Sequence, residues 1–443
     1  MKSRSFKRSH SPARAKAKAK APPARSVEVE IEEIGARGDG VARLGGEQVF
    51  VPFTVPGDRV VARVEGRRGE GLAAALIEVV AAGPGRAQPP CPHFGRCGGC
   101  ALQHVDDALY ADWKRGLLVT QLARAGLGDV PVGALVRVPP GSRRRAAFAF
   151  NRRKGQTVLG FNARASHAVI DLEACLLLEA PLMALLPPLR AMLAEIVADG
   201  EDGDVVVTLT ENGLDVLVEA DARLDLFDRE RLAAFADAQD LARLSWRRPG
   251  AGFVDPIARR RPALVRFAGV AVEPVPGGFL QPTKGGELAI AEAVVAAVGK
   301  AETVADLYSG CGSFTFPLAV GGRVVHAVEG EEAPIRALEA AANAHGLRVT
   351  AEVRDLARRP LLAPELKKFQ AVVFDPPRAG ASAQAEQLAE AGPGLVVAVS
   401  CNPATLARDL KILRDGGYVI DAVTPIDQFP FSAHLEAVAV CRR

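Results

Sequence analysis

The chain has little sulfur, few aromatic side chains and no long apolar run. Its 443 residues include seven cysteines and only 5% Phe, Trp and Tyr. Seven unevenly spaced cysteines exclude a disulfide-stapled scaffold, which a chain this long does not need for stability. No stretch approaches the ~18 uninterrupted apolar residues of a membrane span, and the start of the sequence lacks the apolar run of a secretory signal. We therefore expect a cytoplasmic protein of two or three domains with no membrane partner.

The charge is distributed unevenly along the chain. Residues 1–25 hold nine Lys or Arg and no acidic residue, whereas the remainder holds 46 basic and 52 acidic residues. Lys-Ala repeats with Pro and Ser cannot bury apolar surface, so we expect residues 1–25 to form a disordered basic tail. Its charge would attract phosphate backbones, which makes nucleic acid the partner to test. A solubilising tail or a transit-like leader explains the same composition equally well.

Short runs of alternating apolar and polar residues follow this tail. They are separated by turn signals such as Gly38-Asp39-Gly40, Gly45-Gly46 and Pro56-Gly57-Asp58. This pattern predicts four or five short strands that form a small OB-like β-barrel over residues 26–84. Such barrels often hold nucleic acid, although many unrelated functions share the fold.

A Gly/Pro linker at residues 81–90 leads into a cysteine-rich segment with Cys91, Cys97 and Cys100. A C-x5-C-x2-C run with a distant fourth thiol can hold either zinc or an iron–sulfur cluster. The sequence from 85 to 270 mixes helical and strand patterns, which predicts a central α+β domain. We expect helices near residues 106–127 and 180–197, and strands around residues 148–170.

The last part of the chain, residues 271–443, alternates short apolar runs with helical segments. This alternation is typical of a parallel sheet with crossover helices, so we predict a Rossmann-like α/β domain. The predicted strands are Thr303–Leu307, Arg323–Glu329, Ala371–Asp375 and Leu395–Ser400.

The first of these strands runs into a Gly310-x-Gly312 turn and then into a helix near Phe314. Glycines at the carboxyl end of a strand let the backbone approach a ligand closely. Glu329 ends the following strand, where an acid suits ribose hydroxyls. Only two glycines of the dinucleotide fingerprint are present, which disfavours NAD. Although a lone Gly-x-Gly turn is often only structural, three acids at successive strand ends make S-adenosylmethionine the better interpretation: Asp306, Glu329 and Asp355.

The next strand ends in Phe374-Asp375-Pro376-Pro377-Arg378. Two prolines restrict the loop, so the Asp375 carboxylate is held at the sheet edge where ligands bind. Enzymes that methylate exocyclic amines resemble this motif with an aromatic residue after the prolines. Arg378 occupies that position here, which disfavours methylation of amines.

Cys401 lies at the tip of the predicted fifth strand, before a helix that begins near Thr405. A helix N-terminus favours the reactive thiolate, although an inert buried thiol is the commoner case. A methyltransferase needs a thiolate for carbon 5 of uracil, because addition to carbon 6 makes carbon 5 nucleophilic. A general base must then remove the proton at carbon 5. Glu436 is the candidate base, although these residues alone favour a surface glutamate on a last strand.

These motifs together resemble the RNA uracil-5 methyltransferases, specifically the branch with a TRAM domain and an iron–sulfur cluster that acts on 23S ribosomal RNA. The resemblance extends over residues 26–443 and is carried by FLQPT, LYSGCGSF, FDPPRAG, SCNPATLARDL and the final HLE. It implies a TRAM barrel at 26–84, a cluster-bearing central domain at 85–270 and a class I methyltransferase domain at 271–443.

The resemblance also assigns roles to individual residues. It implies that Cys401 is the nucleophile and Glu436 the base. It implies cofactor contacts from Gln281, Tyr308, Ser313, Glu329, Asp355 and Asp375, and a [4Fe–4S] cluster on Cys91, Cys97, Cys100 and Cys175. Family members commonly have Asn at the positions of Thr283 and Ser313, so individual cofactor contacts can differ here.

Three alternatives are compatible with part of this pattern. Radical methylthiolating enzymes use a C-x3-C-x2-C spacing, which is absent. Cytosine-5 methyltransferases carry a second cysteine beside the proline of the fourth-strand motif, and Asp375-Pro376 has none. A non-enzymatic RNA-binding protein leaves Cys401, Asp375 and Glu436 unexplained. Transfer RNA is the second substrate after ribosomal RNA, and the sequence indicates no obligate protein partner.

Two basic clusters, Arg143–Arg145 and Arg152–Lys154, flank a segment that contains Phe148 and Phe150. Arginines that contact phosphates beside aromatic rings that stack on bases are typical of RNA-binding surfaces. An RNA-contacting face is one interpretation of this segment, and an ordinary solvated charged face is the commoner one.

Overall fold

The computed structural model describes residues 25–443, which form two compact units. The first unit comprises residues 25–35 and 39–84, and the second comprises residues 36–38 and 85–443. The expected basic tail lies outside the described residues except for Arg25. Within residues 25–443, none of the helices has both the length and the apolar character that crossing a membrane requires.

The first unit is one six-stranded sheet in the order β1-β5-β6-β4-β3-β2. Its alternating residues point to one buried face that includes Val49, Val60 and Ala62, as the apolar pattern predicts. Gly45 and Gly46 both have positive φ in the β3–β4 hairpin turn, a conformation that glycine adopts without strain. The strands are β1 (Ser26–Glu30), β2 (Glu33–Ile34), β3 (Gly40–Leu44), β4 (Glu47–Val51), β5 (Arg59–Arg68) and β6 (Gly71–Ala81).

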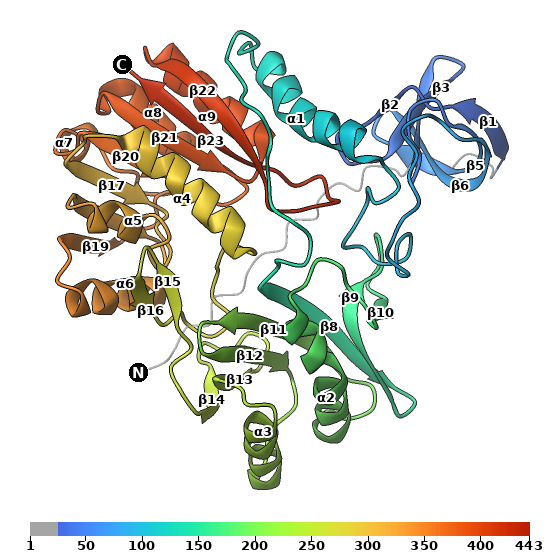
Figure 1. Cartoon of the computed structure of the whole chain (residues 1–443), viewed down its shortest axis with the longest axis horizontal. Helices are drawn as coiled ribbons and strands as arrows, with labels where there is room; N and C mark the ends of the chain where they lie inside the picture. The colour runs from blue at the N-terminus through green and yellow to red at the C-terminus, as the bar shows by residue number, and fades with distance from the viewer. Residues whose placement is uncertain (1–24) are drawn as a thin grey trace, which may run out of the picture. The chain divides into compact units, whose positions relative to one another are not determined.

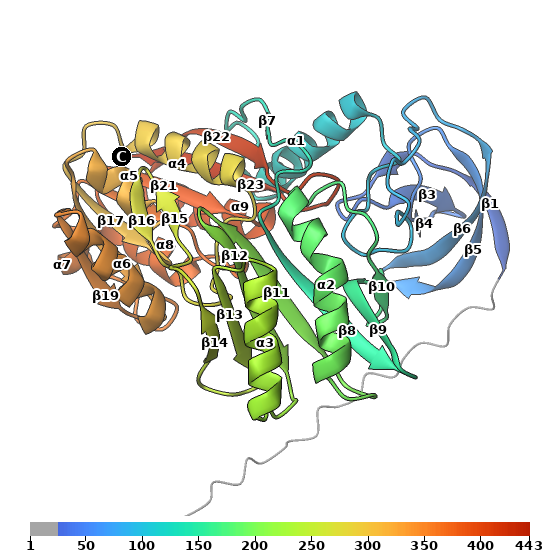
Figure 2. The ribbon, with the colours of Figure 1, turned by 60° about the horizontal axis from the view of Figure 1, so that its bottom comes forward.

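The second unit contains a seven-stranded sheet in the order β10-β9-β8-β11-β12-β13-β14. Helices α2 (Ala180–Ile196) and α3 (Leu226–Ala238) cover one face of this sheet (Figure 2). The strands are β8 (Arg145–Arg153), β9 (Gln156–Asn162), β10 (Val169–Asp171), β11 (Asp202–Thr210), β12 (Gly213–Ala220), β13 (Arg243–Arg247) and β14 (Asp255–Arg259).

The same unit contains an eight-stranded sheet in the order β19-β18-β17-β20-β21-β23-β22-β7 (Figure 1). Strands β17 to β21 are parallel, and β23 pairs antiparallel with β21 and β22. Their near-continuous apolar sequences suit strands that are buried on both faces. The strands are β17 (Thr303–Leu307), β18 (Val324–Glu329), β19 (Val349–Val353), β20 (Ala371–Phe374), β21 (Leu395–Ser400), β22 (Val419–Asp427), β23 (Glu436–Arg442) and β7 (Val136–Arg137).

Helices cover both faces of the eight-stranded sheet. On one face, an apolar core joins the sheet to α4 (Lys284–Val298) and α5 (Thr315–Val320). A second core on this face contains α6 (Glu332–Ala344) and the β15–β16 hairpin (Val265–Phe267 and Val270–Val272). The other core contains α1 (Asp107–Arg124), α7 (Ala363–Leu366), α8 (Ser382–Ala391) and α9 (Pro403–Asp415). The result is the three-layer α/β arrangement that the alternation predicts.

The strand order reverses between β17 and β20, so the loops after these strands diverge and leave a crevice at their carboxyl ends. All four strands predicted from the sequence are present within one residue of their expected bounds. Two segments from outside residues 271–443 complete the layer: β7 pairs with β22, and α1 packs against α9.

Candidate active site

A cavity of about 990 Å³ opens at the carboxyl edge of the eight-stranded sheet. Its volume lies at the upper end of the range for small-molecule sites. Residues from the ends of β17, β18, β20 and β21 line it, together with the 274–282 loop, Arg143 and Arg145, and all four cysteines of the predicted cluster. Of the predicted active-site and cofactor residues, this wall includes Gln281, Tyr308, Glu329, Asp375, Cys401 and Glu436.

The turn after β17 is shaped for close approach of a ligand. Gly310 and Gly312 have φ of 54° and 105°, and a Cβ on Gly312 would overlap the Phe316 ring. Tyr308 also has a positive φ of 61°, a strained conformation for a non-glycine residue. Glu329 stabilises the turn because its Oε2 accepts a hydrogen bond from the Gly310 N–H at 3.0 Å. This cradle fits the adenosyl ligand that the sequence predicts.

Two predicted cofactor contacts lie away from this wall. Asp355 is exposed, and its Oδ1 caps its own turn by accepting hydrogen bonds from the N–H groups of Ala357 and Arg358 at 3.1 and 3.3 Å. Ser313 is partly buried and is not among the residues that line the cavity. Their cofactor roles stay predictions.

A chain of three hydrogen bonds joins Asp375 to Glu436. Gln281 Nε2 donates to Asp375 Oδ2 at 3.4 Å, and Gln428 Nε2 donates to Gln281 Oε1 at 2.7 Å and to Glu436 Oε1 at 3.2 Å. No motif in the sequence distinguishes Gln428. It directly follows β22, whose residue Ile426 pairs with Glu436, so only the antiparallel register brings it to the site.

Burial governs the electrostatics of the two carboxyl groups. Glu436 is 3% exposed, and burial raises its pKa, although the hydrogen bond from Gln428 opposes the shift. Burial also raises the pKa of Asp375, and the negative charges of Glu436 and Asp306 add to the shift. Glu436 Oε2 is buried and has no hydrogen-bond partner among the described residues.

Cys401 is half-buried and stands two residues before α9. Burial and the charges of Glu436 and Asp375 raise the pKa of its thiol to about 11, against a smaller lowering effect of Arg378. Burial is the largest of these effects, so the thiol form is favoured in the free protein, and the nucleophile role of Cys401 stays a prediction. Activation of this thiol requires a base or a nearby cation.

The four predicted cluster ligands share this cavity. Burial raises the pKa of Cys97, Cys100 and Cys175, and the charge of Cys91 adds to each shift. Four half-buried thiols that line one cavity and repel one another as thiolates are a donor set suited to a cationic centre. Within residues 25–443, however, no three His, Cys, Asp or Glu side chains are arranged closely enough to hold a metal ion, so the cluster stays a prediction.

The structure changes the interpretation of the two basic clusters. Arg144 is buried and pairs with Glu287 at 2.6 Å, while Arg143 and Arg145 line the cavity. The expectation that Phe148 and Phe150 stack on RNA is wrong, because both rings are fully buried in the core beneath α2. The presence of charged and aromatic residues in a strand does not show which of its two faces is buried against other elements.

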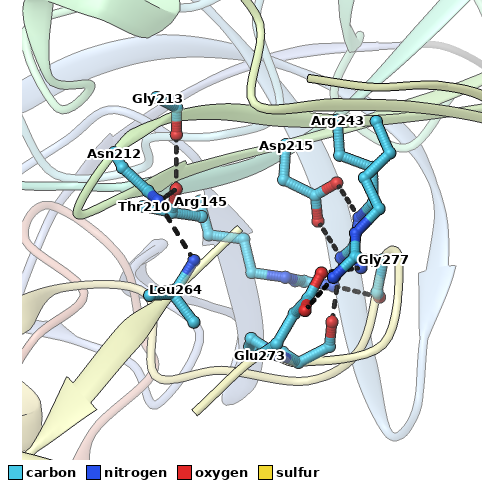
Figure 3. A network of polar contacts seen from close by, with 11 residues as sticks. Arg145, Thr210, Asn212, Gly213, Asp215, Arg243, Leu264, Glu273 and Gly277 are labelled. Atoms are coloured by element: carbon cyan, nitrogen blue, oxygen red, sulfur yellow. Dashed lines mark hydrogen bonds and ion pairs between the residues drawn. The ribbon is translucent and has the colours of Figure 1, made fainter. Parts of the chain in front are cut away.

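Figure 3 shows how the seven-stranded sheet holds the loop that presents Gln281. Arg243 forms a buried two-pronged ion pair with Asp215, with both N–O distances at 2.8 Å, and donates to the Pro274 carbonyl at 2.8 Å. Arg145 donates to the Gly277 carbonyl at 3.0 Å. These contacts hold the backbone of the loop a few residues before Gln281.

Comparison with known proteins agrees with this geometry. Residues 270–443 match the tRNA (Uracil-5-)-methyltransferase family, and residues 27–78 match the TRAM domain of tRNA (uracil(54)-C(5))-methyltransferase. A Rhizobium meliloti protein described as an uncharacterized RNA methyltransferase is 45% identical, over 94% of this chain and 99% of its own length. The 23S rRNA (uracil(1939)-C(5))-methyltransferase of Halomonas elongata is 36% identical, over 93% of this chain and 88% of its own.

Among solved structures, the Pyrococcus abyssi tRNA (uracil-54, C5)-methyltransferase in complex with S-adenosyl-L-homocysteine superposes with a TM-score of 0.74. The match covers 94% of this chain and 100% of the other at 24% identity, which establishes the shared fold. The full-length relatives, the two matching domains and the cofactor cradle lead to one conclusion: this chain belongs to the RNA uracil-5 methyltransferase family of S-adenosylmethionine-dependent enzymes.

Proposed function

We propose that this protein methylates carbon 5 of a uridine in RNA through a covalent bond between Cys401 and carbon 6 of the base. The observation that carries the proposal is the convergence of Cys401, Asp375 and Glu436 on the cavity that also contains the glycine turn. The mutual effects of these three groups on one another's pKa support their proximity.

The reaction begins with loss of the Cys401 proton to a carboxylate of the site. The Cys401 sulfur bonds to carbon 6, and the carbon 5–carbon 6 electron pair moves onto carbon 5 and the carbon 4 carbonyl. S-adenosylmethionine supplies an electrophilic methyl group to carbon 5. Glu436 then takes the proton from carbon 5, the double bond re-forms, and the thiolate leaves. The raised pKa of Glu436 suits this role because it makes the carboxylate a stronger base than an exposed glutamate.

The Cys401→Ala and Glu436→Gln variants test this sequence of steps. Cys401→Ala should transfer no methyl group and form no adduct with RNA. Glu436→Gln should methylate the RNA once and remain bonded to it, because nothing removes the proton from carbon 5. Normal turnover by Cys401→Ala, measured with radiolabelled cofactor, would overturn the mechanism.

We further propose 23S ribosomal RNA as the substrate, because a full-length relative with 36% identity carries that name. Transfer RNA is the second candidate, since the 24% identical fold relative is named for it. Both substrates place the enzyme in the cytoplasm. Mass spectrometry of 5-methyluridine in purified 23S RNA and transfer RNA, from cells with and without the protein, distinguishes them.

We propose that six residues contact the cofactor. Four lie on the cavity wall: Gln281, Tyr308, Glu329 and Asp375. Two lie away from it: Ser313 and Asp355. The presence of four thiols on one cavity wall supports a [4Fe–4S] cluster on Cys91, Cys97, Cys100 and Cys175, with zinc as the alternative. Protein isolated without oxygen should contain iron and sulfide in equal amounts. Stoichiometric zinc without sulfide would overturn the assignment.

We propose that the chain has three domains, with bounds at 26–84, 85–270 and 271–443.

A further inference from the structure

The loop between β22 and β23, residues 428–435, connects Gln428 at one end to the position before Glu436 at the other. Phe429 of this loop lines the cavity, and Gln428 donates to the Glu436 carboxyl. The hydrogen bond from Gln428 holds Glu436 Oε1, which leaves Oε2 as the oxygen available to accept a proton. The conformation of the loop therefore determines where the base is held.

A fully buried lysine of α1 holds the loop at several points. Lys114 is 0% exposed, and its Nζ donates to the carbonyl oxygens of Phe429 and Ser432 at 3.0 and 2.7 Å. The same ammonium group pairs with Asp427 Oδ1 at 2.8 Å, one residue before Gln428. Burying a charge is costly unless it is paired, and here three oxygens of one short segment solvate it.

Tyr110 lies one helical turn before Lys114 and completes the clamp. Its hydroxyl donates to Asp427 Oδ2 at 2.6 Å and accepts the Phe431 N–H at 3.0 Å. Phe431 has a φ of 59°, so the loop adopts a strained backbone conformation that the surrounding contacts must maintain. Its carbonyl accepts hydrogen bonds from Ala101 and Leu102, at 2.8 and 3.2 Å. These two residues directly follow Cys100, so the cysteine segment anchors the same loop.

We propose that Lys114 is a positioning residue for the proton-removal step: its contacts with the 428–435 loop hold Gln428, and through it the Glu436 carboxyl, in the productive place. This inference rests on the proposed function, because it assigns Glu436 the role of base. The positioning role predicts that loss of Lys114 slows one chemical step more than the other. Because Cys401 lies outside this loop, we expect bond formation by Cys401 to depend on the loop less than removal of the carbon 5 proton does.

The test uses the full-length Lys114→Met protein, which keeps the length of the side chain and removes the ammonium group. With uridine RNA and excess cofactor, we expect release of methylated RNA to slow at least tenfold. The covalent protein–RNA complex should accumulate on a denaturing gel. With 5-fluorouridine RNA, the adduct cannot collapse because fluorine replaces the departing proton. Its rate of formation, per folded enzyme, should stay within about twofold of the unaltered protein.

A merely structural role for Lys114 gives a different result. Partial unfolding would lower both rates equally and would leave no accumulated complex with uridine RNA, and this outcome overturns the proposal. Lys411→Met, which removes a lysine from an exposed pair with Asp415 on α9, is the matched control and should change neither rate. Because Lys114→Met leaves Asp427 buried without its cation, Lys114→Met/Asp427→Asn provides a second variant. It should fold better and retain the slow release.

Failure of the proposed function is distinguishable from failure of this inference. If the unaltered protein forms no adduct with 5-fluorouridine RNA, the Cys401 mechanism is wrong whatever Lys114 does. If the unaltered protein forms the adduct and Lys114→Met releases methylated uridine RNA at the normal rate, the positioning role alone is wrong.

Discussion

At the scale of single residues, the site combines groups that sequence motifs identify with groups that only folding brings together. Cys401 stands at a strand end before a helix, which indicates a nucleophile, whereas Glu436 is identified as the base only by the resemblance of the whole set of motifs. Gln428 and Lys114 carry no such signal. They are 1% and 0% exposed. The partner of Gln428 lies across a strand pair, and the carbonyl partners of Lys114 lie in the 428–435 loop, more than 300 residues further along the chain. Arg144 is the opposite case. Its charge in the sequence indicates an exposed contact with RNA, but the structure buries it in an ion pair.

The raised pKa of Glu436 leads to a prediction about stability and pH. A carboxyl whose pKa is raised by folding favours the folded state when protonated, and this contribution is lost as the pH rises through the raised pKa. Glutamine does not ionise, so Glu436→Gln should be more stable than the unaltered protein at pH 8. We expect Tm to rise by about 2–4 °C there.

The same difference should disappear as the pH falls below the ordinary range of glutamate, because the carboxyl is then protonated in both the folded and unfolded states. Thermal melts of both proteins across pH 4 to 8 measure this difference in Tm. A variant that is less stable than the unaltered protein at pH 8 would show that the Glu436 carboxylate is not strained by burial.

At the scale of elements, the local pattern predicts strands well and their partners poorly. The strands β17, β18, β20 and β21 follow from apolar runs that end in glycine, acid or proline signals. The pairing of β7 with β22 joins residues 136–137 to residues 426–427, and nothing in either short segment indicates the other. The local period of apolar residues shows which face of a strand is buried. The distant strand with which it pairs depends on contacts across the whole core.

The glycine turn after β17 gives a prediction about cofactor binding. Gly312→Ala adds a methyl group that overlaps the Phe316 ring at a φ of 105°, so the turn must shift. We expect the affinity for S-adenosylhomocysteine to fall at least tenfold, as measured by calorimetry. Gly322→Ala is the matched control because Gly322 has a φ of 86° but no atom within 4 Å of the added Cβ. Unchanged affinity of Gly312→Ala would remove this turn from the cofactor site.

The anchor of the 274–282 loop gives a prediction about folding energy. Arg243→Met leaves the Asp215 carboxylate buried without its cation, which should lower the free energy of unfolding by about 3–5 kcal/mol. Urea titration monitored by Trp246, which is buried on the same strand, measures the loss in a Trp113→Phe background. Arg243→Met/Asp215→Leu should recover much of it. A single variant as stable as the unaltered protein would mean that this ion pair does not hold the loop.

At the scale of the whole molecule, the residues that line the cavity all belong to the unit of residues 85–443. The sequence predicts both β-rich and α/β regions because hydrophobic period and turn signals change along the chain. It does not predict that one cavity collects the cysteines, the arginines and the nucleophile, since these lie in three separate segments. That convergence depends on how the seven-stranded and eight-stranded sheets of the larger unit are placed.

A shortened chain of residues 85–443 tests this assignment. It should bind S-adenosylhomocysteine with an affinity within about twofold of the full-length protein, because the deleted residues contribute nothing to the cavity wall. Its RNA affinity should be lower, with a weaker dependence on salt, if the β-barrel contributes phosphate contacts. Loss of cofactor binding by a folded shortened chain would show that the site requires the β-barrel.

The central claim is a covalent bond between the Cys401 sulfur and carbon 6 of uracil. It is tested most directly by mass spectrometry of the protein–RNA complex formed from 5-fluorouridine RNA and S-adenosylmethionine, after digestion of both polymers. The account predicts one peptide containing Cys401 whose sulfur is bonded to carbon 6 of a 5-fluoro-5-methyl-5,6-dihydrouridine nucleotide. Attachment at another residue, or no attachment by a protein that methylates uridine RNA under the same conditions, would contradict it.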